Sequence, residues 1–290
     1  MTANRLTGVF AAIVTPVTAA GRPDHARFLT HARWLMDHGC DGLNVLGTTG
    51  EATSFAADDR IALMEAAAEA LSPERLMVGT GCPDLPTTLR LTRAAGRLGF
   101  GAALVLPPYY YKGVADVGLE SYFRRLADAT DTPLYLYNFP QMTGLSLSPA
   151  LAARLARAAP GRIRGAKDSS GDLVYAARLA EIPDFDVFPS DEATLAQARA
   201  AGFAGCISAT VNVTCRAAAR LWRDPDDAAA LAACRDMRAA IAAHPLIPAV
   251  KHMVARRQGD PGFAETLPPL APLDAVARQA LDALDPDTFG

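Results

Sequence analysis

The sequence predicts an α/β protein, built as a (β/α)₈ TIM barrel with a C-terminal three-helix extension. Short apolar runs alternate with longer helical stretches eight times over about 220 residues, as such a barrel requires. The 290 residues are 50% hydrophobic and 20% charged, enough apolar material for one large core, which excludes a disordered chain. A doubly wound open sheet is the main alternative, but it more often has about six strands and a phosphate loop after the first.

The eight predicted strands are short apolar segments. They cover residues 9–14, 42–46, 76–80, 102–106, 134–137, 162–166, 186–188 and 205–208. Helices are predicted between them at 28–37, 60–71, 87–98, 120–129, 149–158, 173–180, 192–200 and 214–222. Ser148 followed by Pro149 offers an N-cap with proline in the first helical position, and Pro133 and Pro183 mark joins between units.

Strand signals stop after Asp224. Three helices are predicted in the remaining chain, at 226–243, 248–257 and 273–284. We therefore expect a catalytic barrel over residues 1–224 and a helical extension over residues 225–290.

Charge and motif content narrow the function. A formal net charge of −3 argues against nucleic-acid and anionic-membrane partners. No signal peptide is visible, and the longest charge-free stretch, 200–215, is too short and too polar to span a bilayer. Five cysteines without a CxxC pair predict free thiols in the cytoplasm. No HExxH, zinc spacing, P-loop or GxGxxG occurs, so we expect neither a metal nor a nucleotide cofactor.

In an α/β barrel the active site lies at the C-terminal ends of the strands, and polar residues collect there in this sequence. The segments are GTTGE (47–51), TGC (80–82), PPYYY (107–111), YNFP (137–140), KDSS (167–170), SDE (190–192, beginning with Ser190) and SAT (208–210).

Lysine is scarce in this chain. Of the 28 basic residues only Lys112, Lys167 and Lys251 are lysines, and the other 25 are arginines. Lys112 lies in a polar loop, and Lys251 is predicted to be a surface residue of a helix. Lys167 is the one at a strand end.

Lys167 shares a strand face with Ile163 and Gly165 by period-two alternation. If that face points into the barrel, the amine is desolvated above the glycine, and a neutral amine is a nucleophile for a carbonyl. Arginine cannot do this chemistry. The alternative is a lysine paired with Asp168 or another carboxylate.

Three further features carry open alternatives. Tyr137, with Tyr135 as its same-face neighbour, can transfer protons beside the lysine or be an ordinary core tyrosine. The turn 47–51 offers backbone N–H groups and two hydroxyls suited to a carboxylate, or is simply a tight loop that opens a helix. The tyrosines 109–111 form either a catalytic element or an exposed aromatic patch for subunit contact.

Taken together, these motifs resemble a known family. GTTGE (47–51), PYYYK (108–112), YNFP (137–140), GAKDSSGD (165–172) and IPAVK (247–251) occur in the order found in the dihydrodipicolinate synthase and N-acetylneuraminate lyase family. These are class I pyruvate-dependent enzymes, and the resemblance covers essentially the whole chain, including the tail.

The resemblance implies a role for each matching residue. Lys167 forms an imine with pyruvate, Tyr137 is the general acid and base, Thr48 relays protons, and Tyr110 reaches into the site of a neighbouring subunit. The expected substrate-binding residues are Thr49, Gly47, Gly50, Ile207, Ser190 and Met142. The resemblance further implies tight dimers paired into a homotetramer, with pyruvate or another 2-oxo acid as the small-molecule partner.

Met142 departs from the synthase pattern. Dihydrodipicolinate synthases carry arginine two residues after the proline of YNxP, where it holds the carboxylate of aspartate semialdehyde. A thioether there removes charge-assisted hydrogen bonds worth roughly 1.5–3 kcal/mol each. YNFPxxTG is more similar to aldolases that act on 2-keto-3-deoxy sugar acids, which yield pyruvate and a hydroxyaldehyde.

Three alternatives remain open. The first is 4-hydroxy-tetrahydrodipicolinate synthase, which condenses pyruvate with aspartate semialdehyde, with another arginine compensating for Met142. The second is cleavage of 4-hydroxy-2-oxoglutarate. The third belongs to another class: a non-catalytic barrel that binds a keto acid.

Overall fold

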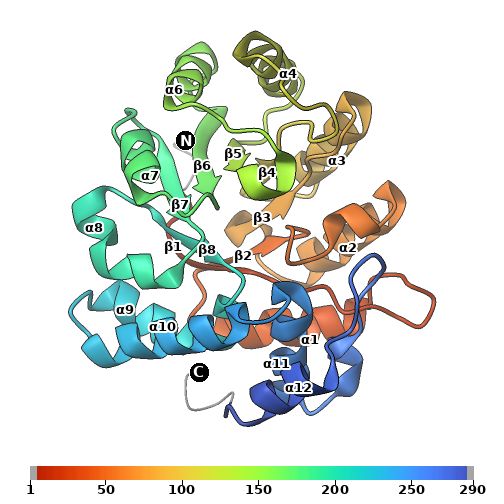
Figure 1. Ribbon diagram of the computed structural model, residues 1–290. Helices are drawn as coiled ribbons and strands as arrows, with labels where there is room; N and C mark the ends of the chain where they lie inside the picture. The colour runs from red at the N-terminus through yellow and green to blue at the C-terminus, as the bar shows by residue number, and fades with distance from the viewer. Residues whose placement is uncertain (1–4, 286–290) are drawn as a thin grey trace.

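A computed structural model describes residues 5–285, which form a barrel of eight parallel strands surrounded by helices (Figure 1). The strands are β1 (Gly8–Ala12), β2 (Gly42–Val45), β3 (Leu76–Gly79), β4 (Ala102–Val105), β5 (Leu134–Asn138), β6 (Ile163–Asp168), β7 (Asp186–Pro189) and β8 (Gly205–Ser208). Their order is β7-β6-β5-β4-β3-β2-β1-β8, and the Ala204 amide donates to the Val187 carbonyl where β7 meets β8. The predicted TIM barrel is confirmed.

The helices follow the strands as the sequence predicts. They are α1 (His25–Asp37), α2 (Ala57–Ala70), α3 (Leu85–Arg97), α4 (Asp116–Asp128), α5 (Pro140–Thr143), α6 (Pro149–Ala158), α7 (Leu173–Ala180), α8 (Ala198–Ala201) and α9 (Val211–Arg223). Ser148 caps α6 by accepting from the Leu151 amide, with Pro149 in the first helical position. The helix expected at 192–200 is instead a 3₁₀ helix over Glu192–Gln197 followed by the short α8.

The C-terminal extension consists of α10 (Ala228–Ala242), α11 (Leu246–Gln258) and α12 (Ala275–Asp282). These helices lie beside α9 and α1 on one side of the barrel (Figure 1). They pack in one hydrophobic cluster that also contains Val14, which lies two residues after β1, and Val213 of α9. Because the extension shares this core with the barrel, the division at residue 224 stays a prediction.

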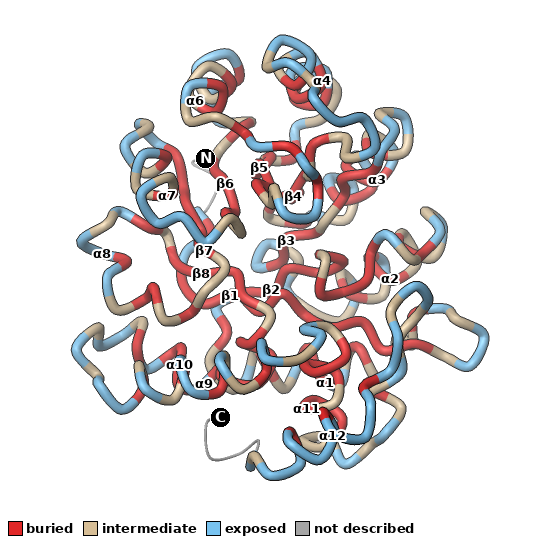
Figure 2. Tube along the Cα trace, in the orientation of Figure 1, coloured by how far each residue is buried: buried red, intermediate tan, exposed pale blue. Residues whose placement is uncertain are grey.

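The strands are buried on both faces, which is why they read as continuous apolar runs (Figure 2). The inward face forms its own cluster, which includes Phe10, Tyr135, Tyr137, Phe188 and Ile207. The shared inward face of Tyr135 and Tyr137 is therefore confirmed.

All five cysteines are buried free thiols. Within residues 5–285, no helix is both long enough and apolar enough to cross a membrane.

Strand β6 differs from the expected alternation. Its register against β5 shifts between Leu134 and Tyr135, whose partners are Ile163 and Gly165. Arg164 is the extra residue of this bulge, and Ile163 consequently packs in the outer cluster with the helices. The prediction that Ile163 shares a face with Lys167 is wrong. The space left by Gly165 is filled by Tyr135, since a Cβ there would lie 2.5 Å from that ring.

Candidate active site

Lys167 lies near the top of β6, directly beside Tyr137 of β5 in the strand register. Its side chain is nearly buried, with 4% of the residue exposed, and Nζ lies 4.5 Å from the centre of the Tyr137 ring. Among the described residues no carboxylate forms an ion pair with this amine.

Asp168 is not the partner of the lysine, so that alternative is not what the structure shows. Its carboxylate accepts from Asn138 Nδ2 at 2.7 Å and from Ser170 Oγ at 2.8 Å. Burial raises the pKa of Asp168, and the hydrogen bonds from Asn138 and Ser170 oppose that rise. Asn138 also accepts from the Leu147 amide at 3.1 Å. These bonds join the ends of β5 and β6 and fix the strands that carry Tyr137 and Lys167.

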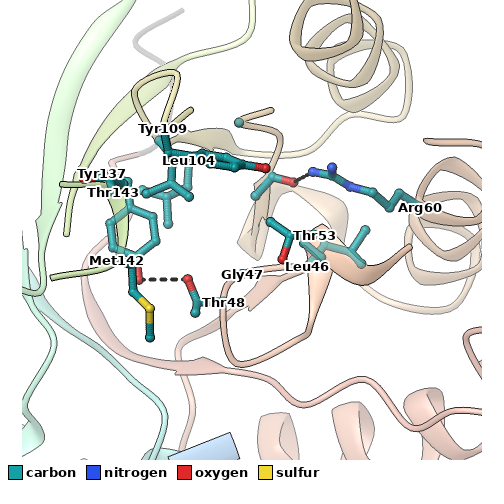
Figure 3. A pocket seen from close by; sticks show the side chains of 14 residues that line it. Leu46, Gly47, Thr48, Thr53, Arg60, Leu104, Tyr109, Tyr137, Met142 and Thr143 are labelled. Atoms are coloured by element: carbon teal, nitrogen blue, oxygen red, sulfur yellow. Dashed lines mark hydrogen bonds between the residues drawn. The ribbon is translucent and has the colours of Figure 1, made fainter. Parts of the chain in front are cut away.

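Thr48 and Tyr137 meet across the top of the barrel. Thr48 Oγ1 lies 3.4 Å from the Tyr137 hydroxyl, and either oxygen can donate (Figure 3). The Tyr137 ring stacks on Phe139, with centroids 5.8 Å apart, and is 3% exposed. This places two hydroxyls in series beside the lysine amine, an arrangement that can pass a proton.

The turn after β2 is shaped by two residues in the left-handed region. Leu46 has φ 52° and Glu51 has φ 54°. Between them, a Cβ on Gly47 would lie 2.3 Å from Asn44 Nδ2, so a larger residue there would require the Asn44 side chain to move. The Glu51 amide donates to the Thr48 carbonyl at 3.1 Å and closes the turn. This geometry holds Thr48 and Thr49 at the mouth of the barrel.

A cavity of about 440 Å³ opens above Lys167, which is the size of a small-molecule site. It brings together most of the predicted residues, namely Thr48, Thr49, Tyr137, Met142, Lys167, Ser190 and Ile207. Gly47 lines an adjoining cavity that shares Thr48, Tyr137 and Met142 (Figure 3). Gly50 lines neither cavity, and a Cβ added to it would lie 3.0 Å from the Ile13 carbonyl oxygen. Tyr110 is 75% exposed and lines neither cavity.

The C-terminal extension contributes residues that the sequence did not reveal. Arg238 of α10 lines the cavity, and its Nε lies 3.2 Å from Asp191. Its Nη1 lies 3.2 Å from Ser208 Oγ and 3.5 Å from the fully buried Glu192. The first turn of α11 and Leu270 complete the wall. Nothing local in the sequence marks Arg238 among 25 arginines.

The prediction that Lys251 lies on a helix surface is wrong. Lys251 is fully buried and forms an ion pair with Glu51. Lys112 is exposed as expected, but its Nζ donates to the carbonyls of Tyr109 and Thr143, each at 2.6 Å. Of the three lysines, Lys167 alone combines burial with a cavity and no ion pair within residues 5–285.

The chain has clear similarity to known proteins. Residues 5–284 match the sequence profile of the Dihydrodipicolinate synthetase family. A 4-hydroxy-tetrahydrodipicolinate synthase of Synechococcus sp. (strain CC9311) is 37% identical over 72% of this chain and 69% of the relative. An uncharacterized DapA-like lyase of Chloroflexus aurantiacus is 36% identical over 70% of this chain and 69% of the relative.

A solved structure has the same fold. It is YagE of E. coli K12, described as a prophage protein of the dihydrodipicolinic acid synthase family in complex with pyruvate. The two chains superpose with a TM-score of 0.88 over 96% of each, at 28% identity.

Proposed function

Because the chain belongs to the dihydrodipicolinate synthetase family, whose members are class I pyruvate-dependent lyases, we propose that Lys167 forms the imine and that the substrate is a 2-keto-3-deoxy sugar acid. The resemblance drawn from the motifs is thereby confirmed at the level of family and enzyme class. The residue roles and the substrate are our proposal.

The observation that carries it is the buried Lys167 amine, without an ion pair in the described part of the chain, beside Tyr137 at the floor of the cavity. The amine adds to the C2 carbonyl of the substrate, and loss of water gives the imine. A base then takes the C4 hydroxyl proton, the C3–C4 bond breaks, and the aldehyde leaves. Protonation of the enamine at C3 and hydrolysis of the imine release pyruvate and restore Lys167.

Tyr137 and Thr48 are the proposed proton carriers for these steps. Their hydroxyls are 3.4 Å apart, and Tyr137 adjoins the Lys167 amine, beside the C2 carbon from which water leaves when the imine forms and to which it adds on hydrolysis. Tyr110 would complete the relay from a second copy of the chain. Its 75% exposure, together with the 71% exposure of Tyr111, fits a residue that is covered on assembly.

The substrate carboxylate belongs at the turn 47–51 in this proposal. Thr49 and Thr48 face the cavity, and successive backbone N–H groups in a tight turn favour an anion. Ile207, Ser190 and Met142 line the remainder of the cavity. YagE in complex with pyruvate shares this fold, which supports pyruvate as the ligand.

The charge of the cavity supports a sugar acid over aspartate semialdehyde. Lys167 and Arg238 are the two basic residues among its described lining residues, and Met142 occupies the position of the synthase arginine. Arg238 already contacts Asp191 and Glu192, so its charge is offset. Among the described residues that line this cavity, no arginine without a carboxylate partner is therefore present to bind a second substrate carboxylate.

Synthase activity remains the second candidate, because the Synechococcus relative carries that name. In this proposal the protein further assembles as a homotetramer and acts in the cytoplasm. The tetramer is tested by light scattering of the purified protein, in which a monomer of 30.5 kDa would contradict it.

The decisive experiment for the imine is reduction with borohydride in the presence of pyruvate, followed by peptide mass spectrometry. We expect one adduct on Lys167 and none in Lys167→Arg. An unmodified Lys167 would refute both the imine and the proposed catalytic function. The remaining alternative would be a barrel that binds a keto acid without catalysis.

The substrate is tested by comparing three reactions at equal enzyme concentration. These are pyruvate release from 2-keto-3-deoxy sugar acids, pyruvate release from 4-hydroxy-2-oxoglutarate, and condensation of pyruvate with aspartate semialdehyde. We expect the first to have the highest kcat/KM. A higher value for either of the other two would overturn the choice of substrate.

A further inference from the structure

A buried ion pair joins the turn after β2 to the C-terminal extension. Glu51 ends the turn and Lys251 lies 200 residues later on α11, and both side chains are fully buried. Burial lowers the pKa of Lys251, and the negative charge of Glu51 opposes that shift. Removing two charges from water is costly, and an apolar contact of similar volume is often at least as stabilising. Packing alone therefore does not explain this ion pair.

Both oxygens of Glu51 are engaged by the extension. Oε1 contacts Lys251 Nζ, and Oε2 accepts from the Leu267 amide at 2.9 Å. Glu51 is therefore held from two sides, by α11 and by the segment that precedes α12. The same two parts of the chain line the active-site cavity, through Leu246 at the start of α11 and through Leu270.

Glu51 also has an unfavourable backbone conformation. Its φ of 54° is in the left-handed region, which is strained for a non-glycine residue and persists where neighbouring contacts impose it. The Glu51 amide donates to the Thr48 carbonyl at 3.1 Å, so the orientation of Glu51 is transmitted to the residue whose hydroxyl meets Tyr137. The ion pair and the proton relay are thus connected through one short turn.

We propose that Glu51 and Lys251 are positioning residues, a clamp that fixes the turn 47–51 against the extension and so sets Thr48 and Thr49 relative to Lys167. The clamp itself touches no substrate. It rests on the proposed function, because its effect is read through pyruvate bound at Lys167. In this proposal the C-terminal extension fixes the position of the turn 47–51 and thereby the geometry of the pyruvate site.

The test measures the pyruvate concentration that gives half-maximal borohydride trapping, together with thermal stability. The variants are Lys251→Met and the double variant Glu51→Gln with Lys251→Met. The matched control is Met253→Ala, a fully buried residue of the same helix that packs in the C-terminal cluster. Should Lys251→Met alone fail to fold because Glu51 is left buried and unpaired, the double variant carries the test.

We expect the double variant to be more stable than Lys251→Met, because no buried charge is left without its partner. Its half-saturating pyruvate concentration should nevertheless rise about tenfold or more, since small displacements of binding groups have large effects. Maximal trapping should stay within about twofold of wild type, because Lys167 is intact. Met253→Ala should lose stability and keep the wild-type half-saturation.

Two outcomes would overturn the clamp. One is wild-type half-saturation in the double variant, and the other is an equal rise in Met253→Ala, which would reduce the effect to general destabilisation. Failure of the proposed function is distinguishable, since it appears as no adduct in the wild-type protein itself, and it removes the clamp as well.

Discussion

The sharpest prediction concerns the Tyr137 hydroxyl. Its one hydrogen-bond contact among the described residues is to Thr48 at 3.4 Å, near the limit for such a bond. Tyr137→Phe keeps the ring, its stacking on Phe139 and its place beside Lys167. The free energy of unfolding should therefore change by less than about 1 kcal/mol. Loss of a general acid and base should lower kcat by about 10² to 10⁴.

Tyr135→Phe is the matched control on the same strand and the same inward face. The Tyr135 hydroxyl donates to the buried Asp186 carboxylate at 2.7 Å. A hydrogen bond to a charged group contributes about 1.5–3 kcal/mol, and each kcal/mol shifts Tm by about 2 °C or more in a chain of this size. This variant should lose stability and keep its activity, the reverse of Tyr137→Phe.

The assays are initial rates of pyruvate release, borohydride trapping at saturating pyruvate, and thermal unfolding of both variants. A Tyr137→Phe protein with wild-type kcat would refute the relay. Equal activity losses in the two variants would show that the inward face responds to packing rather than to the position of one hydroxyl.

Burial lowers the pKa of His31 to about 4 from 6.5, so below pH 6.5 the unfolded chain binds a proton that the folded chain excludes. The free energy of unfolding should fall by about 3 kcal/mol in total between pH 6.5 and 4, and urea titrations should show a flatter profile for His31→Gln. Gly165→Ala would place a Cβ 2.2 Å from the Asp186 carbonyl, and a cost of about 1–3 kcal/mol should appear as a lower Tm. Met142→Arg restores the synthase arginine at a 62% exposed position, and we expect kcat/KM for aspartate semialdehyde to rise about tenfold, with no rise arguing that the position does not contact the aldehyde.

Local patterns were sufficient for the barrel. Each predicted strand overlaps an observed one, because strands buried on both faces are apolar runs that need no tertiary information to be recognised. The segment after β7 differs from the single helix that the sequence predicts, since Glu192 starts a 3₁₀ helix and is held by buried contacts with Ser208 and Thr214. Those partners come from other strands and helices, and no local window contains them.

The residues of the site also fall into two groups, those that the sequence predicts and those that it does not. Lys167, Tyr137, Thr48 and Thr49 follow strand ends, so the fold alone predicts that they converge. Lys251 and Arg238 come from the extension, and their placement depends on how α10 and α11 dock on the barrel. The local sequence predicts a solvated lysine at 251, because its partner Glu51 lies 200 residues away.

The bulge at Arg164 interrupts the alternation of side chains along β6, so the side chains below it and above it follow separate inward–outward patterns. Below it, Ile163 points to the helices, and above it, Lys167 points to the cavity, although an uninterrupted strand would turn both to the same side. Deleting Arg164 should leave a regular strand with both orientations preserved. Inserting a residue between Gly165 and Lys167 should rotate the amine into the helix layer. Strand β6 should therefore tolerate a change of length at its base that it should not tolerate near the end that carries Lys167.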